Sequence, residues 1–213
     1  MQLIIFDCDS TLSAIEGIDE LARVRGPETF AETEALTNAA MNGDVAIDEI
    51  FARRLDIIQP DLATCEHVAQ LYIDHIEPTA VATLDKLRAA GWHIVIVSGG
   101  FTQVIKPLAN YLGVSRVEAV PLHFNPDGSY AGFDTSAPPT RNGGKPEIIA
   151  RLKAELKPSR VVMVGDGVSD LEAQNEVDTF IGFGRYAKRK RVVAEADHFV
   201  TSLDEIPAII GAS

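Results

Sequence analysis

The sequence predicts an α/β fold with a doubly wound, mainly parallel sheet, an inserted all-helical cap and a short β-hairpin insertion. Three observations predict it: apolar runs alternate with helical patterns, one long stretch contains helical patterns only, and an Asn-Pro-Asp-Gly turn separates two short β-like segments. Apolar residues make up 46% of the 213 residues, which is sufficient for a sizeable core.

The strands are predicted from three runs that are rich in Val and Ile and do not alternate with polar residues. These runs are LIIF at 3–6, HIVIV at 93–97 and RVVMV at 160–164. Unbroken apolar runs of this length are typical of parallel strands covered on both faces. Further strands are expected near 117–124, 178–183 and 197–202.

Helical patterns lie between these runs. Residues 80–90 end at a glycine, which is a common helix stop. Residues 102–112 form a second pattern, in which Pro107 is expected to kink or interrupt the helix. A third pattern at 146–156 begins with Pro146, a residue favoured at the first helical position. Alternating strands and helices indicate the doubly wound arrangement.

Two stretches depart from this alternation. Residues 14–78 contain only helical patterns and are too long for one crossover helix, so we expect an inserted helical subdomain, or cap. Residues 1–13 plus 79–213 would then form the core domain that contains the sheet. Residues 122–134 carry the turn sequence NPDG between β-like segments and predict a hairpin.

Composition limits the classes of function. The net charge of −12 disfavours nucleic-acid binding, which depends on Lys and Arg that neutralise phosphates. The two cysteines, Cys8 and Cys65, form no disulfide framework, and no signal peptide or membrane span is visible. The expectation is a cytoplasmic protein without a nucleic-acid or membrane partner; its oligomeric state is not determined by the sequence.

Polar residues follow each of the three main strands. In open α/β sheets, ligands bind beyond the carboxyl ends of the strands, so these residues are expected to meet. Several carboxylates at one place repel one another unless a cation lies between them. Carboxylate and carbonyl oxygens suit Mg²⁺, so a magnesium site is predicted. The acids concerned are Asp7 and Asp9 after the first strand and Asp166 and Asp170 after the third.

The same edge carries groups that suit an anion. Ser98 offers a hydroxyl, and Gly99 and Gly100 allow backbone N–H groups to approach a ligand closely. Lys145 is placed at about the N-cap of the helix that begins at Pro146, where a cation opposes the helix dipole. A locally unfavourable residue indicates either a solvated loop or a functional contact, and together with the other groups we favour a phosphate contact.

A metal, an anion cradle, a lysine and two neighbouring acids suit phosphoryl transfer. One aspartate attacks phosphorus to form an acyl-phosphate that water then hydrolyses. Because Asp7 is fixed directly at the strand end, it is predicted to be the nucleophile. Asp9 is predicted to be the general acid/base that protonates the leaving oxygen and later deprotonates the water.

The segments DCDST, SGGF, the Lys145 segment and GDGVSD resemble, in order and type, the four motifs of the haloacid dehalogenase (HAD) superfamily, and most closely its phosphoserine phosphatase branch. The resemblance spans residues 3 to about 197. It implies a Mg²⁺-dependent phosphatase of serine biosynthesis that works through a phosphoaspartate. It also implies that the metal is held by Asp7, the backbone carbonyl of Asp9 and Asp166, with Asp170 supporting them.

The cap segment supplies candidates for recognition of the rest of the substrate. Arg54 falls on the apolar face of a helix predicted over 47–58, while Arg53 points to the other side. From the pattern alone, the Arg54 head either reaches out to solvent, pairs with an acid such as Glu16, or binds a ligand. The resemblance implies that Arg54 and Glu16 bind the carboxylate and ammonium of phosphoserine and that Met41 lines the apolar part of the site. Ser169 stands where relatives often carry Asn or Thr and is a further substrate-binding candidate.

Other functions remain open at this point. The same scaffold suits a phosphatase for another small phosphomonoester or a phosphotransferase from phosphoserine to homoserine. A regulatory module that is phosphorylated on aspartate is the non-enzymatic alternative, although it requires neither a helical cap nor a second acid. The basic run RYAKRKR at 185–191 is interpreted as a solvated loop and helix start, with the border of the active site as the alternative. Cys8 is expected to face away from its neighbouring acids, into the core.

Overall fold

The structure, a computed structural model, describes residues 1–42, 44–45 and 47–212. Within these residues, six parallel strands form one sheet in the order β3-β2-β1-β6-β7-β8, which confirms the predicted fold class. The strands of this sheet are β1 (Gln2–Phe6), β2 (Trp92–Phe101), β3 (Arg116–Val120), β6 (Arg160–Gly165), β7 (Thr179–Phe183) and β8 (His198–Val200).

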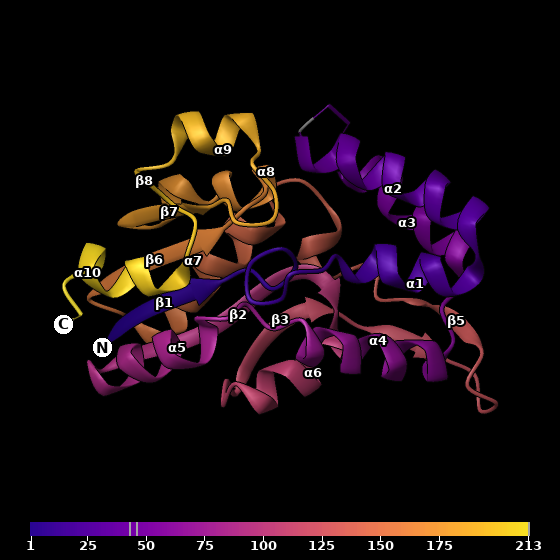
Figure 1. Cartoon of the computed structure of the whole chain (residues 1–213), viewed down its shortest axis with the longest axis horizontal. Helices are drawn as coiled ribbons and strands as arrows, with labels where there is room; N and C mark the ends of the chain where they lie inside the picture. The colour runs from indigo at the N-terminus through magenta and orange to yellow at the C-terminus, as the bar shows by residue number, and fades with distance from the viewer. Residues whose placement is uncertain (43, 46, 213) are drawn as a thin grey trace.

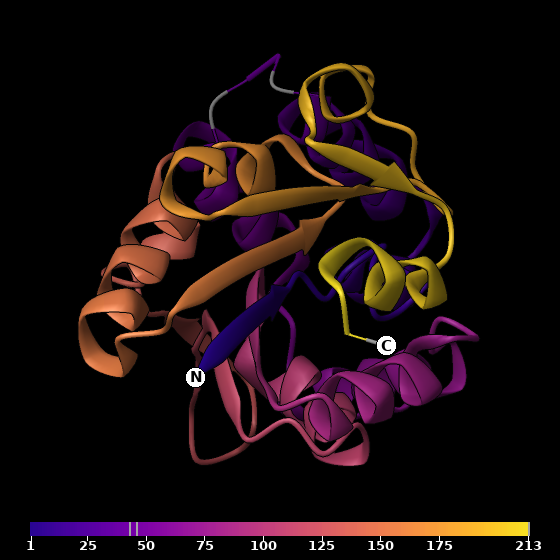
Figure 2. The ribbon, with the colours of Figure 1, turned by 90° about the vertical axis from the view of Figure 1, so that its left-hand side faces the viewer.

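Helices cover both faces of the sheet, because successive residues of each strand point to opposite sides (Figure 2). Phe6 of β1 packs in one core cluster with Leu84 and Ile206, whereas its neighbour Ile5 packs in a second cluster with Ile148. The first face is covered by α5 (Ala80–Ala89), α6 (Thr102–Tyr111) and α10 (Ile206–Ile210). The second is covered by α7 (Gly144–Leu156), α8 (Val168–Leu171) and α9 (Lys190–Glu195).

The pairing register brings the ends of the three central strands to one edge. Phe6 pairs with Ile96 of β2 on one side and with Val164 of β6 on the other. From β1 the chain continues to β2 and β3 in one direction, while β6 to β8 extend the sheet in the other. The edge beyond Phe6 is therefore the switch point at which ligands bind in doubly wound sheets.

Four helices lie beside that edge, away from both chain termini (Figure 1). They are α1 (Gly17–Arg25), α2 (Pro27–Asn42), α3 (Ile47–Ile58) and α4 (Leu62–Asp74). The chain leaves and re-enters the sheet part side by side, since Ser13 and Ile76 form an isolated antiparallel bridge. Apart from that bridge, the described residues between 14 and 78 contain no strand.

One predicted strand is divided in the structure. Residues 117–124 were expected to be continuous, but β3 ends at Val120 and a separate strand, β4 (Leu122–Phe124), pairs with β5 (Tyr130–Phe133) in the predicted hairpin. Pro121 stands between them. Proline has no N–H to donate to a sheet, so it ends one ladder and allows the chain to turn into the other.

The structure bears on two helix expectations. Of the kink or interruption expected at Pro107, the interruption is absent, because helix α6 runs from Thr102 to Tyr111 with the side chains of Val104, Ile105 and Leu108 buried along it. Helix α7 begins at Gly144, so Pro146 is its third residue. Proline is tolerated there because the first four N–H groups of a helix have no partner within the helix.

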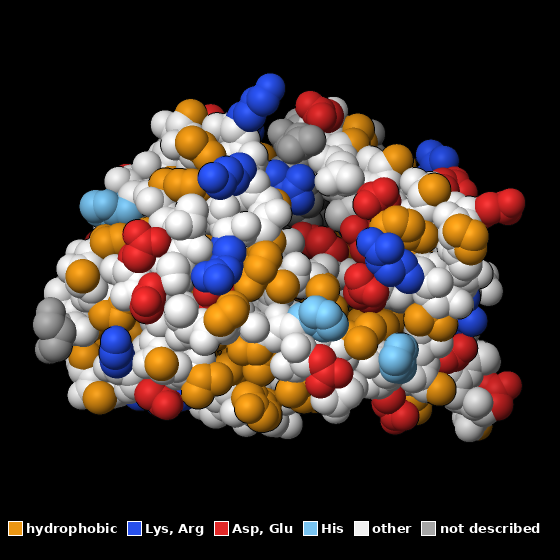
Figure 3. All heavy atoms as spheres, in the orientation of Figure 1, with side chains coloured by type: hydrophobic (Ala, Val, Ile, Leu, Met, Phe, Trp, Pro, Cys, Tyr) orange, Lys and Arg blue, Asp and Glu red, His pale blue; other side chains and the backbone are white. Residues whose placement is uncertain are grey.

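Short 3₁₀ turns complete the chain at Pro138–Thr140, Gln174–Glu176 and Leu203–Glu205. None of the helices within the described ranges is long and apolar enough to cross a membrane. On the face shown in Figure 3, Lys and Arg side chains are interspersed with Asp and Glu rather than gathered in one patch.

The central strands make a direct prediction about stability. Val95 of β2 is fully buried, whereas Val81 of α5 is 44% exposed. Val95→Ala removes two buried carbon groups and leaves a cavity, so it should lower the free energy of unfolding by about 2 kcal/mol. Val81→Ala, the matched control, should change it by less than about 0.5 kcal/mol. Urea denaturation measures both values, and equal losses would contradict the assignment of β2 to the core.

Candidate active site

Asp7 is the first residue after β1, and the sheet fixes its position. Its N–H donates to the carbonyl of Val164 at 2.9 Å, which extends the pairing of β1 with β6. Its side chain is buried, with Oδ1 accepting the N–H of Cys8 at 2.7 Å and Oδ2 lying 3.0 Å from Lys145 Nζ. One carboxylate oxygen is thus held by the backbone, and the other faces a cation.

Three buried acids form a cluster at this edge. Carboxylate oxygens of Asp7, Asp166 and Asp170 all lie within 4.8 Å of one another. Burial, and then the charges of Glu16 and Asp7, raise the pKa of Asp166 well above its usual range. Burial and the charge of Asp7 raise the pKa of Asp170 to about 7. The cluster therefore carries more negative charge than its surroundings balance.

The cluster fits a hard divalent cation. Asp166 Oδ1 accepts the hydroxyl of Thr11 at 3.4 Å, but its buried Oδ2 has no hydrogen-bond partner among the described residues, the nearest cation being Arg189 Nε at 3.8 Å. An unsatisfied buried carboxylate oxygen is costly, and a cation with oxygen ligands relieves that cost. A donor set of carboxylate oxygens is one that hard cations prefer.

Lys145 was expected at about the N-cap of α7. It is instead the second residue of that helix. Its side chain is only 5% exposed, and its Nζ lies 2.5 Å from Asp170 Oδ1 and 3.0 Å from Asp7 Oδ2. Burial lowers the pKa of a lysine, but these two carboxylates outweigh that effect and raise it. Lys145 is therefore a protonated cation between Asp7 and Asp170, although the first turn of a helix disfavours positive charge.

The carboxyl group of Asp9 belongs to a different set of contacts. Its Oδ1 accepts the N–H of Gly17 at 2.7 Å, and its Oδ2 accepts the hydroxyl of Ser98 at 3.1 Å. Burial and the charge of Asp7 raise the pKa of Asp9. Because this carboxyl group lies outside the three-acid cluster, a role for Asp9 in metal binding rests on its backbone carbonyl, which stays a prediction.

The SGGF segment lies inside β2, which extends to Phe101, rather than after the strand as predicted. Pairing with β3 is irregular between Val97 and Phe101, so the strand bends away from regular sheet geometry there. The N–H of Gly100 donates to Ser98 Oγ at 3.0 Å, which orients the serine hydroxyl toward Asp9.

Arg54 lines the same cavity as these residues and is buried, 5% exposed, as its place on the apolar face of α3 indicates. Its Nη1 donates to Thr37 Oγ1 at 3.2 Å, and that hydroxyl in turn lies 3.1 Å from Asp19 Oδ1. The Nε of Arg54 is buried and has no hydrogen-bond partner within the part of the chain that the structure describes. The head neither reaches solvent nor, among the described residues, forms an ion pair with Glu16.

Glu16 accepts the hydroxyl of Ser10 at 2.6 Å. Burial and the charge of Asp9 raise the pKa of Glu16 to about 8. A cationic group placed beside such a carboxyl group would stabilise its ionised form.

One cavity unites most of the predicted site. Nine predicted residues line it: Asp7, Asp9, Glu16, Arg54, Ser98, Gly99, Gly100, Lys145 and Ser169. Asp166 and Asp170 do not line it but join it through the acid cluster that includes Asp7. The side chain of Met41, also predicted here, lies outside the part of the chain that the structure describes.

A family model described as haloacid dehalogenase-like hydrolase matches residues 4–174. The chain belongs to this family. Among curated proteins, the phosphoserine phosphatase of Bos taurus is 34% identical over 205 residues, covering 95% of this chain and 90% of the relative. The phosphoserine phosphatase of Drosophila melanogaster is 35% identical over 208 residues, covering 96% of this chain and 76% of the relative. The predicted family and branch are confirmed.

Solved HAD structures share the whole fold. A phosphoserine phosphohydrolase-like protein from Francisella tularensis matches with a TM-score of 0.90 at 26% identity, over 99% of this chain and 100% of the other. A phosphoserine phosphatase solved as a phospho-aspartyl intermediate analogue matches with a TM-score of 0.86 at 26% identity, over 98% of each chain. HAD phosphatases are generally metal-dependent, in agreement with the acid cluster.

Part of the basic run was misinterpreted as solvated. Lys188, Lys190 and Arg191 are exposed as expected, but the Arg189 side chain is only 12% exposed and its Nε lies 3.8 Å from Asp166 Oδ2. Arg185 pairs with the fully buried Glu77 at 3.1 Å. A sequence signal existed, because this run follows β7 and so begins at the same sheet edge as the acids.

Sequence reasoning also missed residues that line the cavity or hold its groups. Arg141 lies in the segment just before Lys145, where a second basic residue in RNGGK was the available signal. Thr37 and Asp19, which hold Arg54, had no signal, because a contact between two helices does not follow from the pattern of either one. The remaining cavity residues that were not predicted are Ile18, Ala40, Phe51, Phe101 and Pro139.

The acid cluster predicts stabilisation by a divalent cation. A cation that binds only the folded protein contributes about 2.7 kcal/mol at a hundred times its Kd. For this chain length the melting temperature should rise by about 5 to 10 °C, which differential scanning fluorimetry measures. Asp166→Asn should abolish most of this rise, whereas Asp204→Asn, an exposed acid outside the cluster, should keep it. An undiminished rise in Asp166→Asn would show that the cation binds elsewhere.

Proposed function

We propose that this HAD enzyme is a phosphoric monoester hydrolase that converts O-phosphoserine to serine and phosphate in a Mg²⁺-dependent reaction. The observation that carries the proposal is the shared lining of one cavity. Asp7, Asp9 and Lys145 line it together with Arg54 and Glu16, which come from the helical segment. The phosphoserine phosphatases of several animals, at about a third identity over most of this chain, support the same substrate.

Asp7 is the proposed nucleophile. Its carboxylate attacks phosphorus, and the bond between phosphorus and the ester oxygen of the substrate breaks. The proton that the departing oxygen needs comes from Asp9. Water then attacks the resulting acyl-phosphate on Asp7, Asp9 takes the proton of that water, and inorganic phosphate leaves. Both acids end in their starting states.

Mg²⁺ would be held by Asp7, the backbone carbonyl of Asp9 and Asp166, with Asp170 in support. When bound, it neutralises the charge that gathers on the carboxylates and the phosphate oxygens. Lys145 adds a second positive centre, because its Nζ lies 3.0 Å from Asp7 Oδ2 and is fixed by Asp170. Ser98 and Gly99 contribute polar groups at the cavity wall for the remaining phosphate oxygens.

The rest of the substrate would meet the residues that the helical segment contributes to the cavity. Arg54, with its Nε lacking a partner, would bind the carboxylate of phosphoserine. Glu16 would bind the ammonium group. Burial opposes ionisation of the Glu16 carboxyl group, and the positive charge of the ammonium would favour it. Gly100, Ser169 and Met41 complete the proposed contacts. A phosphosugar offers neither charge and would leave both side chains unmatched.

This division assigns roles to two parts of the chain. Residues 1–13 plus 79–213 would form the catalytic core, and residues 14–78 the cap that recognises the amino-acid part. The bridge between Ser13 and Ile76, where the chain passes from one part to the other, supports the proposed boundary.

Asp7→Asn tests the nucleophile. The amide cannot form the acyl-phosphate, so kcat for phosphoserine should fall by about 10⁴-fold or more. Phosphate release with Mg²⁺ in excess measures the rate, and no phosphoenzyme should be trapped by acid quench. Activity close to wild type would refute the covalent mechanism. Asp204→Asn is the control for the loss of one negative charge, since Asp204 is exposed.

Arg54→Ala tests the substrate, and its neighbour Arg53 provides the matched control. Loss of a charged hydrogen bond should raise KM for phosphoserine about tenfold to a hundredfold. KM for p-nitrophenyl phosphate, which has no carboxylate, should hardly change. The Arg53 side chain is 61% exposed on the far face of the same helix, so Arg53→Ala should alter neither value. Equal effects of Arg54→Ala on both substrates would exclude a role in carboxylate recognition.

A further inference from the structure

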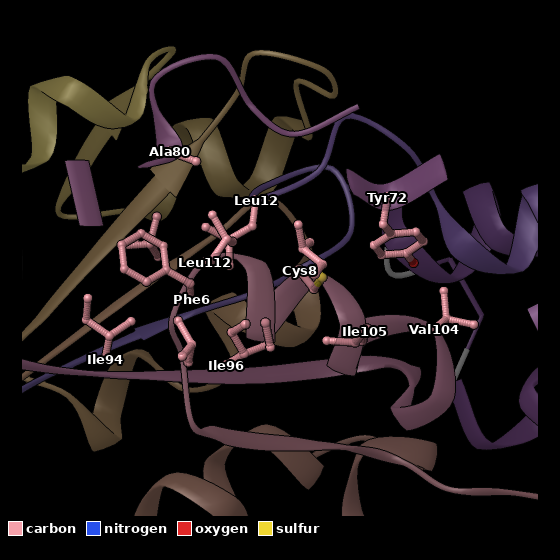
Figure 4. Close-up of a cluster of buried hydrophobic side chains, with 14 of the residues drawn as sticks. Phe6, Cys8, Leu12, Tyr72, Ala80, Ile94, Ile96, Val104, Ile105 and Leu112 are labelled. Atoms are coloured by element: carbon pink, nitrogen blue, oxygen red, sulfur yellow. The ribbon is translucent and has the colours of Figure 1, made fainter. Parts of the chain in front are cut away.

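Tyr72, on a helix of the segment between residues 14 and 78, contacts Asp9, the proposed general acid/base. It belongs to α4, is fully buried, and lies in the large core cluster that also contains Val104 (Figure 4). Its hydroxyl donates a hydrogen bond to Asp9 Oδ1, from a position 63 residues away in the sequence. The mechanism proposed above makes no use of this contact.

The same carboxylate oxygen has a second donor. The N–H of Gly17 donates to Asp9 Oδ1 at 2.7 Å. A Cβ atom on residue 17 would lie 2.1 Å from the Tyr72 hydroxyl oxygen, so only glycine allows the backbone and the phenol to approach Oδ1 together. Two fixed donors, one from a side chain and one from the backbone, therefore engage one oxygen of Asp9.

The other oxygen faces the cavity. Asp9 Oδ2 accepts the hydroxyl of Ser98 at 3.1 Å, and a Cβ on residue 100 would lie 2.8 Å from it. Ser98 and Gly100 line the cavity, whereas Tyr72 and Gly17 are not among its lining residues. Oδ1 is thus turned into the protein and Oδ2 toward the space that the substrate would occupy.

A carboxyl oxygen that already accepts two hydrogen bonds is a poor place for a proton, because that proton would meet two donors. A phenol keeps its own proton near neutral pH and so remains a donor throughout the reaction. The one donor to Oδ2 is the hydroxyl of Ser98, which can rotate and accept a hydrogen bond instead, whereas the Gly17 N–H at Oδ1 can only donate. The contacts therefore leave Oδ2 as the oxygen that carries the exchangeable proton. This is the oxygen within reach of a leaving group in the cavity.

We propose that Tyr72 is a positioning residue that, with the Gly17 N–H, directs the transferable proton of Asp9 to Oδ2. This inference rests on the proposed role of Asp9. As the phosphorus–oxygen bond of the substrate breaks, the bond between Oδ2 and its proton breaks and that proton joins the ester oxygen. In the second step Oδ2 takes a proton from the attacking water. The proton of Tyr72 stays on its hydroxyl in both steps.

The leaving group provides a test that a purely structural role would not affect. Serine and phenol are poor leaving groups that need a proton, whereas p-nitrophenolate departs without one. The ratio kcat/KM reports the steps up to phosphoryl transfer to Asp7, so later hydrolysis of the acyl-phosphate does not contribute. Phenyl phosphate and p-nitrophenyl phosphate have nearly the same shape and differ mainly in leaving-group basicity.

Tyr72→Phe removes the hydroxyl and keeps the ring. Because the Gly17 N–H remains, kcat/KM for phosphoserine and for phenyl phosphate should fall about tenfold, a part of the full effect of a general acid. The value for p-nitrophenyl phosphate should change by less than about twofold. Tyr111→Phe, a control at a 62% exposed position, should leave all three values unchanged. Equal losses on the three esters, or no loss on any, would overturn the inference.

A second measurement guards against loss of stability in the buried variant. If Tyr72 acts only through Asp9, Tyr72→Phe introduced into Asp9→Asn should leave the ratio of phenyl to p-nitrophenyl phosphate activity unchanged. A further fall in that ratio would contradict the inference. The proposed substrate and the proposed role of Tyr72 can fail separately. Wild-type protein that hydrolyses both aryl esters but not phosphoserine would contradict phosphoserine as the substrate. The ratio of phenyl phosphate activity to p-nitrophenyl phosphate activity would still decide the role of Tyr72.

Discussion

The site depends on how the repulsion among buried carboxylates at one edge of the sheet is balanced. Asp7, Asp166 and Asp170 bring their oxygens within 4.8 Å of one another, and Lys145 is the cation held directly between two of them. Arg189 Nε lies 3.8 Å from Asp166 Oδ2, but one lysine and one arginine do not balance three acids, so the site favours a further cation. In a chain of net charge −12, a cation bound among these acids would supply, together with Lys145, the local positive charge that holds a phosphate.

The parallel sheet makes that arrangement possible. β1 lies between β2 and β6, and its register aligns Phe6 with Ile96 and Val164, so the residues that follow each strand meet at one place. Buried apolar strands hold the backbone of Asp7 rigidly, while α7 brings Lys145 from the second face. Rigid elements keep the reacting groups in fixed positions, as phosphoryl transfer requires.

The helical segment contributes to both recognition and chemistry in the proposed mechanism. Through Thr37, α2 holds the guanidinium of Arg54, which faces the same cavity as Asp7. Through Tyr72, α4 contacts the acid/base itself. Substrate recognition and proton transfer are thus linked to one packed unit, so a change in the packing of these helices would reach the reacting groups without altering the sheet.

The sequence by itself determined the strands, the order of the polar strand ends and the apolar face that carries Arg54, because these follow from residue periodicity and from the rule that parallel strands end at one edge. Tertiary structure alone decided which groups pair. Lys145 meets Asp170 across 25 residues, and Tyr72 meets Asp9 across 63. Arg189 lies beside Asp166 although its neighbours in the basic run are exposed. Local pattern encodes which face a residue occupies, but side-chain contacts between distant segments depend on how helices pack, which no single segment specifies.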